Sequence, residues 1–378
     1  MVTISATCIT YNKAYKFRLL PNIEQQILIG KTFGCVRFVW NLLLNYTDGY
    51  YKEYGKTKYI TPGGLKPDFP WLAEVDSLAL ANAQMNLKKA YQAFFNKVSG
   101  FPCFKGKKDI RQSYTTNNQE VSNAIRIEGN SIKLPKLGLV HLVLHRQLKA
   151  TEKIKNCTIS KTPSGKYYVS IIVAGVSHIE QVKPNPDKIL GLDYAMNGFF
   201  VSSEGETANY PRYYRSAEAK LHKLSRAVSR KKKGSNNRYK ARLKLAKWHE
   251  RISNMRNDFL HKLTFKLATT YDAIVVEDIN MRDMSQALKF GKSVADNGFG
   301  IFRRFLDYKL LDRGKQLIKI DKWFPSSQTC SNCGSINDKL ALSDRVYSCI
   351  NLDCNTVLGR DYNAALNIKT AGIAGIAW

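Results

Sequence analysis

The sequence predicts an α+β protein of several domains, and three observations support this prediction. Apolar residues recur at helical spacing through residues 23–98. Short strand-like runs, separated by Asn, Gly and Pro, follow between residues 112 and 174 and are typical of a small antiparallel barrel. From residue 189 onwards, apolar strands alternate with helical segments. A chain of 378 residues has room for about two to four such domains.

The N-terminal part is predicted to be a strand followed by helices. Residues 6–20 alternate as a strand does and can join the barrel, and Pro21 ends it. Asn22 is placed to cap a helix that begins at Ile23, with Gln25 in the capping-box position. A second helical segment is expected at residues 33–51, and a third at residues 77–96. These segments form the helical unit.

Apolar periodicity and Pro or Asn positions also predict the barrel strands, a linker and the elements of the second half of the chain. Pro and Asn at residues 182–186 predict a linker between the two parts. The barrel strands are expected at residues 112–116, 124–127, 131–134, 139–144, 154–161 and 167–174. Beyond the linker we expect strands at 189–193, 198–202 and 317–320, a helical region at 212–269 divided by a basic turn at 230–237, a flexible stretch at 293–300, and a helix at 301–315.

The chain is strongly basic, with 59 Lys and Arg against 30 Asp and Glu and a formal charge of +29. Such an excess points to a polyanionic partner, of which nucleic acid is the commonest. Between residues 212 and 258 there are sixteen basic residues and three acids. We interpret this region as a phosphate-binding surface, with a solvated helix face as the alternative. The candidate contacts are Arg212, Arg215, Arg230, Lys231, Lys232, Lys233, Arg238 and Lys240, together with Lys105, Lys107 and Lys108 in a basic, aromatic stretch.

No apolar run approaches the roughly 20 residues of a membrane span, and the first residues lack the layout of a signal peptide. We therefore expect a protein of the prokaryotic cytoplasm, associated with the nucleoid and not with a membrane. Of the eight cysteines, Cys8, Cys35, Cys103 and Cys157 are scattered and are expected to be small apolar core residues.

The other four cysteines predict a metal site. Cys330 and Cys333 form a C-x2-C pair, and Cys349 and Cys354 form a C-x4-C pair after fifteen intervening residues. Two thiolate pairs at this distance can surround one Zn²⁺ tetrahedrally. Because all four ligands are cysteines, no position stays open for a substrate, so we expect a structural zinc and not a catalytic one. A redox pair or core cysteines are the alternatives.

Three acids predict a second metal site. The apolar run at residues 189–192 ends on Asp193, and the run at 273–276 ends on Glu277. A buried acid needs a cation, a proton or hydrogen bonds. Asp361 follows the cysteine cluster and is the third candidate. Three converging carboxylates can hold two Mg²⁺ ions for phosphodiester hydrolysis, whereas each acid alone is more often a helix cap or an ion-pair partner.

These motifs, taken in order, resemble the TnpB family of insertion-sequence nucleases, which are related to type V CRISPR effectors. The resemblance covers nearly the whole chain and lies in residues 14–22, 100–102, 191–193, 275–279, 323–334 and 359–365. Asp193, Glu277 and Asp361 match the family's three metal-binding acids. The segment 194–197 departs from the Gly and Lys found in many relatives, which puts substrate handling near the first acid in doubt.

The resemblance implies a fold and a function. It implies an RNase H-like RuvC nuclease domain at residues 184–325 and 358–378, with an inserted zinc-binding module for target nucleic acid at 326–357. A wedge β-barrel at 1–22 and 99–183 and a helical recognition unit at 23–98 are implied beside it. The implied activity is RNA-guided cleavage of double-stranded DNA next to a short motif, by a monomeric complex with a guide RNA. A non-cleaving RNA-guided regulator and a transposase that needs no guide are the alternatives.

Overall fold

The computed structural model describes residues 7–58, 60–107, 112–119, 123–195, 198–287, 291–341 and 343–375. The chain divides into two compact units. The first, Ile9–Ser177, is called the N-terminal unit below. The second is built on His178–Trp378 and is called the C-terminal unit.

The N-terminal unit contains a seven-stranded sheet. Its strands are β1 (Thr7–Leu20), β2 (Gln112–Asn117), β3 (Arg126–Glu128), β4 (Ser131–Leu134), β5 (Gly138–Val143), β6 (Lys153–Lys161) and β7 (Tyr167–Ile179). They lie in the order β2-β6-β7-β1-β5-β4-β3, and the strands predicted from the sequence are all present. The two end strands, β2 and β3, do not pair with each other within the described residues, so closure into a barrel stays a prediction.

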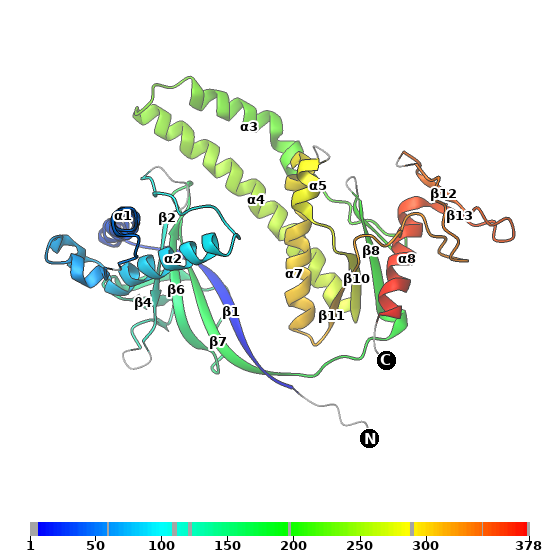
Figure 1. Cartoon of the computed structure of the whole chain (residues 1–378), viewed down its shortest axis with the longest axis horizontal. Coiled ribbons are helices and arrows are strands. Elements are labelled where there is room, and N and C mark those ends of the chain that lie inside the picture. The colour runs from blue at the N-terminus through cyan, green and yellow to red at the C-terminus, as the bar shows by residue number, and fades with distance from the viewer. Residues whose placement is uncertain are drawn as a thin grey trace. The chain divides into compact units, whose positions relative to one another are not determined.

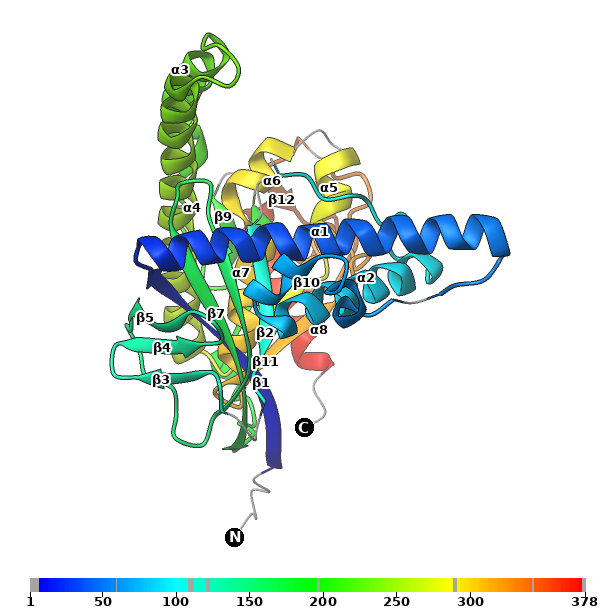
Figure 2. The same cartoon turned by 90° about the vertical axis from the view of Figure 1, so that its left-hand side faces the viewer.

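Two helices, α1 (Ile23–Tyr54) and α2 (Ser77–Phe95), pack in the same unit, and Figure 2 shows α1 as one continuous helix. The predicted capping box is confirmed, because the Asn22 side chain accepts from the Gln25 N–H at 2.8 Å and Gln25 accepts from the Asn22 N–H at 3.1 Å. The expectation of two separate helical segments is wrong. No residue with a helix-breaking conformation interrupts α1 before its left-handed cap at Gly55.

Helix α1 is buried on two sides, because its apolar side chains face both the sheet and the other helices of the N-terminal unit. Ile29 and Phe33 join the core beneath the sheet, and Val39 and Leu43 pack against α2 and the short 3-10 helices η1 (Pro62–Leu65) and η2 (Pro70–Glu74). Among the described helices, α1 is long and apolar enough to cross a membrane by length and composition, and half of its most apolar stretch is buried. The core helix of a globular protein has the same properties.

The C-terminal unit is organised around a four-stranded sheet (Figure 1). Its strands are β8 (Ile189–Ala195), β9 (Phe199–Ser202), β10 (Ala273–Glu277) and β11 (Gln316–Ile320), and the 3-10 helix η3 (Pro186–Lys188) leads into them. In the order β11-β10-β8-β9, the first three strands are parallel and β9 is antiparallel to β8. Helix α8 (Arg360–Ala374) covers one face of the sheet, and the helices α4 (Asn236–Thr270) and α7 (Phe299–Leu311) cover the other.

Helices α3 (Tyr213–Ser229) and α4 run antiparallel and extend beyond the sheet as a hairpin, which Figures 1 and 2 show. Their junction confirms the predicted basic turn. Ser235 caps α4 by accepting from the Arg238 N–H at 3.2 Å.

The stretch at residues 293–300, expected to be flexible, is helical instead. It contains α6 (Gly291–Asn297) and the start of α7, and α5 (Met281–Ala287) precedes it. The physical reason is a tertiary contact, because the buried Asp296 carboxylate accepts from the Tyr214 N–H at 2.8 Å.

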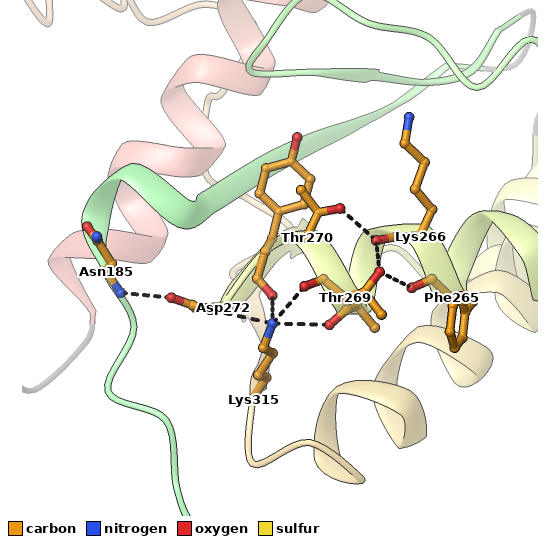
Figure 3. Close-up of polar contacts among 9 residues, drawn as sticks. Asn185, Phe265, Lys266, Thr269, Thr270, Asp272 and Lys315 are labelled. Carbon is orange, nitrogen blue, oxygen red and sulfur yellow. Dashed lines mark hydrogen bonds and ion pairs between the residues drawn. The ribbon is translucent and has the colours of Figure 1, made fainter.

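Lys315 fixes the end of α4 to the start of β11. Figure 3 shows its ammonium group at the last turn of the helix, where it donates to the carbonyl oxygens of Thr269 at 3.3 Å and Tyr271 at 2.8 Å. The Asp272 carboxylate lies 3.5 Å away and accepts from the Asn185 N–H. A lysine at this place satisfies carbonyl groups that a helix end leaves without partners. The linker before β8 is thereby joined to the same cluster.

The scattered cysteines differ in their surroundings. Cys35 and Cys157 are buried, as expected of core residues. Cys103 is exposed, so the expectation is wrong for this residue. The side chain of Cys8 lies outside the described residues.

Candidate functional site

Two of the predicted acids lie at the same edge of the C-terminal sheet. In both β8 and β10, four buried residues are followed by a half-buried acid, Asp193 and Glu277. The strands are parallel neighbours, and Leu192 pairs with Val276, so the next residue on each strand is the acid. Because side chains alternate along a strand, both acids lie on the face that α8 covers. The register therefore brings Asp193 and Glu277 together.

Close packing of α8 brings the third acid to this edge. A Cβ atom at Gly191 of β8 would clash with the backbone oxygen of Ala365, and one at Gly372 of α8 would clash with Val275 of β10. Helix and sheet approach this closely only because both positions are glycine. Asp361 lies in the first turn of α8, one turn before Ala365. The first turn of α8, which carries Asp361, therefore lies toward the edge of the sheet where the two strand-end acids lie.

The electrostatics of Asp193 reflect both of the other acids. Burial raises the pKa of Asp193 well above its ordinary value, and the negative charges of Glu277 and Asp361 raise it further. The Arg360 guanidinium acts in the opposite direction. Burial also raises the pKa of Glu277, and the hydrogen bond from the Ser326 hydroxyl lowers it. The site concentrates negative charge in a protein that is otherwise strongly basic.

The donor set at this edge fits divalent cations with hard oxygen ligands. Three carboxylates, two of them with a raised pKa, are a costly arrangement that a bound cation would relieve. Mg²⁺ prefers such carboxylate oxygens and keeps several of its waters. The residues present are therefore compatible with the predicted magnesium site.

Two residues that act on the acids were not singled out from the sequence. Ser326 donates its hydroxyl hydrogen to Glu277 Oε1 at 2.6 Å. Arg360 bonds to the carbonyl oxygens of Ala341 and Asp344 while its charge acts on Asp193. The position of Arg360 directly before Asp361 could have indicated its role from the sequence. No feature of the sequence around Ser326 indicates that its hydroxyl contacts Glu277.

Tyr194, the first residue of the departing segment, points away from the acids. Its hydroxyl accepts a hydrogen bond from the buried Asn297 amide at 2.8 Å, and its ring lies 4.6 Å from that of Phe299. It therefore packs in the core on the opposite face of the sheet. Met196 and Asn197 lie outside the described residues.

The four clustered cysteines form a compact group whose sulfur atoms all lie within 4.8 Å of one another. Cys330 Sγ is 3.7 Å from Cys354 Sγ, and Cys333 Sγ is 3.5 Å from Cys349 Sγ. They lie between β11 and α8, in a segment that contains the hairpin β12 (Val346–Ser348) and β13 (Val357–Gly359). The part of this segment from Cys330 to the end of β13, residues 330–359, is called the zinc module below.

Tight turns bring each cysteine pair together, as the spacing predicts. The Gly334 N–H donates to the Cys330 carbonyl at 3.0 Å, and Gly334 has a φ of +77° that favours glycine. The Cys354 N–H donates to the Asn351 carbonyl at 3.0 Å. Hydrogen bonding with Ser335 lowers the pKa of the Cys333 thiol to about 6, which favours the thiolate that a metal requires. Four sulfur ligands fit a closed tetrahedral Zn²⁺ site.

The predicted nucleic-acid contacts lie mostly on the α3–α4 hairpin. Arg238 is half-buried there, and its guanidinium donates to the carbonyl oxygens of Val228 at 3.1 Å and Lys231 at 2.8 Å, so it caps α3. In the N-terminal unit, Lys105 lies 3.6 Å above the Trp40 ring. Lys108 lies outside the described residues. The remaining candidates are Arg212, Arg215, Arg230, Lys231, Lys232, Lys233 and Lys240 on or beside the hairpin, and Lys107 in the N-terminal unit.

Comparison with known proteins identifies the fold. A Cas12f1 chain, solved by cryo-EM as a Cas12f1-sgRNA-target DNA complex, matches with a TM-score of 0.59 over 95% of this chain and 99% of that chain, at 12% identity. Residues 299–368 match the family model described as "Cas12f1-like, TNB domain". The molecule is therefore a protein of the Cas12f1-like fold class.

Full-length relatives identify the family. A "Putative RNA-guided DNA endonuclease" of Streptomyces pristinaespiralis is 34% identical over 97% of this chain and 90% of its own length. The "Putative RNA-guided DNA endonuclease InsQ" of Escherichia coli K12 is 30% identical over 97% and 93%. The chain belongs to the TnpB family.

Two further family models match. Residues 170–288 match the model described as "Probable transposase", and residues 11–56 match a "Helix-turn-helix domain". In this structure the latter range is the strand β1 followed by the single helix α1.

Proposed function

We propose that this protein is an RNA-guided DNA endonuclease of an insertion sequence, and that it hydrolyses phosphodiester bonds at the edge formed by Asp193, Glu277 and Asp361. The proposal is supported by the pairing of β8 with β10, by the close approach of α8 to both strands, and by the charges of Glu277 and Asp361 that act on Asp193. Two Mg²⁺ ions bound there would supply an activated water and stabilise the leaving oxygen.

The protein's own residues bind and position the nucleic acid in this proposal. The α3–α4 hairpin presents its exposed Lys and Arg side chains to phosphate groups, independently of sequence. A guide RNA reads the target by base pairing, and the protein reads a short adjacent motif and the shape of the heteroduplex. The names of the two full-length relatives and the Cas12f1-sgRNA-target DNA complex support these partners. We assign one protein chain to each complex.

The domain roles follow from the same reasoning. We assign the sheet of the N-terminal unit to a wedge domain, its helices to a recognition unit, and the C-terminal sheet with its helices to a RuvC-type nuclease. The zinc module is assigned to binding of the target nucleic acid. The match of residues 299–368 to the "Cas12f1-like, TNB domain" model supports the last assignment.

A cleavage assay tests this function. The purified complex, with Mg²⁺ present, is expected to cut double-stranded DNA that matches its copurified RNA and carries an adjacent motif, and to leave unmatched DNA intact. The measurement is gel analysis of a plasmid library with randomised flanks, beside a Glu277→Gln variant. If the variant cuts as the wild type does, the assignment of the acid is wrong.

The match to the "Probable transposase" model favours a second candidate, a transposase that acts on DNA ends without a guide. The two functions differ in their need for RNA. Cleavage that survives complete removal of the RNA would support the transposase. RNA-dependent binding without cleavage would instead support a regulator.

Binding of RNA or heteroduplex is expected to weaken steeply as salt rises, because phosphate binding releases condensed counterions. Replacing Arg230, Lys231, Lys232 and Lys233 with Gln should make the slope of log affinity against log salt shallower. The expected change is about 0.7–0.9 for each phosphate group that the variant no longer binds. Filter binding over a series of salt concentrations, from low to well above physiological, measures the slope.

The matched control for this measurement is Lys262→Gln. Lys262 is an exposed lysine of the same hairpin, but it lies on α4 and is paired with Asp258 at 2.7 Å. An unchanged slope in the fourfold variant would show that the turn makes no phosphate contact.

A further inference from the structure

A short segment connects the acid edge to the zinc module. It begins at Ser326, which is only 6% exposed and donates its hydroxyl hydrogen to Glu277 Oε1 at 2.6 Å. It continues to Cys330, one of the clustered cysteines, which is 2% exposed. One end of the segment therefore touches a candidate magnesium ligand, and the other end is a candidate zinc ligand.

Two asparagines of α8 hold this segment in place. Asn363 and Asn367 lie four residues apart, so their side chains share one face of the helix, and both are buried. Asn367 Nδ2 donates to the carbonyl oxygens of Ser326 at 2.8 Å and Thr329 at 2.6 Å. Asn363 Nδ2 donates to the Thr329 carbonyl at 2.7 Å.

The contacts continue on the other side of the cysteine. The Ser331 N–H donates to Asn363 Oδ1 at 3.0 Å, so the Asn363 amide bonds to the residues that flank Cys330. The two asparagine side chains are buried, so a displaced segment would leave their amide groups without partners. The position of Ser326 is therefore determined jointly by α8 and by the fold of the zinc module.

We propose that Ser326 is a positioning residue of the acid site, and that the zinc module determines, through Asn363 and Asn367, how Ser326 orients the Glu277 carboxylate. This inference rests on the proposed function, in which Glu277 is a metal ligand. A hydroxyl that bonds to one carboxylate oxygen fixes the carboxylate's orientation, which is how groups around a metal site tune its affinity. Loading of the zinc module consequently controls binding of divalent cations at the acids.

Binding of Mn²⁺ alone is the test, because free Mn²⁺ is counted directly by electron paramagnetic resonance and no cleavage is needed. The full-length, zinc-loaded chain is freed of RNA in high salt and titrated. Ser326→Ala is expected to bind Mn²⁺ about 10-fold more weakly than the wild type. Ser326→Thr, which restores the hydroxyl, is expected to recover most of the affinity. Both should keep the wild-type zinc content.

The matched control is Ser331→Ala, because Ser331 contacts Asn363 through its backbone N–H and not through its side chain. It is expected to bind Mn²⁺ as the wild type does. Two further variants test the connection to the module. Asn367→Ala should weaken Mn²⁺ binding while zinc is retained, and Cys333→Ser should weaken it although all three acids are intact.

The outcomes separate this inference from the proposed function. If Glu277→Ala loses Mn²⁺ binding and Ser326→Ala does not, the positioning role is wrong and the acid site stands. Equal weakening in Ser326→Ala and Ser326→Thr would also overturn the role of the hydroxyl. If Glu277→Ala binds Mn²⁺ as tightly as the wild type, the acid site itself is wrong, and the inference fails with it.

Discussion

Replacing Asp193 with Asn is expected to reduce DNA cleavage strongly and, at the same time, to raise the melting temperature of the metal-free protein. Cleavage should fall by about a thousandfold, since bound cations supply several kcal/mol of transition-state stabilisation. The melting temperature should rise by about 2–4 °C, the change that corresponds to about 1 kcal/mol in a domain of this size. The reason is that the asparagine removes a partly buried carboxylate on which the negative charges of Glu277 and Asp361 act.

The same raised pKa values predict how the stability of the metal-free protein changes with pH. Asp193 and Glu277 both have a folded-state pKa above the ordinary value, so the folded protein holds these protons to higher pH than the unfolded chain does. Their stabilising contribution is complete below the unfolded pKa of about 4 and is lost as pH rises through the raised folded pKa. The metal-free wild type should therefore lose stability from these groups as pH rises, and Asp193→Asn should lose less.

Thermal melts from mildly acidic to mildly alkaline pH, with and without Mg²⁺, measure this effect. Mg²⁺ should stabilise the wild type at neutral pH and leave Asp193→Asn nearly unchanged. Asp278→Asn is the matched control, because Asp278 is adjacent to Glu277 but exposed and paired with Arg303 at 3.3 Å. A variant at Asp193 that melts lower than the wild type at every pH would refute the claim of a repelling acid cluster.

Replacing Cys330 with Ser is expected to release zinc and to unfold the zinc module. Structural zinc contributes about 10–16 kcal/mol of apparent binding free energy at neutral pH, so a small module depends on its metal for folding. In the described part of the module, Tyr347 is a fully buried large side chain, and it packs beside the cysteines. Loss of one thiolate should therefore convert residues 331–357 into a protease-sensitive segment.

Elemental analysis and limited proteolysis measure this loss. Cys103→Ser is the control, because Cys103 is exposed and belongs to the N-terminal unit. It should retain the wild-type zinc content. Full zinc content in Cys330→Ser would contradict the assignment of the four cysteines to one site.

The features that depend on residues close together in the sequence could be predicted from the sequence alone. The Asn22 capping box and the basic turn before α4 were predicted because a cap or a turn is decided within a few residues. The cluster of four cysteines was predictable for the same reason, since each pair lies on one tight turn. The strand-end acids were predictable because an apolar run that ends on a carboxylate identifies both the strand and its edge.

Tertiary contacts decided the elements that local signals described wrongly. Residues 293–300 look flexible by composition, but the Asp296 carboxylate bonds to the first turn of α3 and orders them. Cys103 resembles a core residue by type but is exposed, because burial depends on what packs against a segment.

The sequence alone determined the strands, the acids that end them, the cysteine spacing and the basic hairpin, because each is encoded within a short window of residues. Only the tertiary structure decided that α8 lies on β8 and β10 at two glycines, which brings Asp361 to Asp193 and Glu277. It also revealed that Ser326, Asn363 and Asn367 join the acid edge to the zinc module. These contacts connect residues far apart in the chain, and their hydrogen bonds depend on packing that no local pattern encodes.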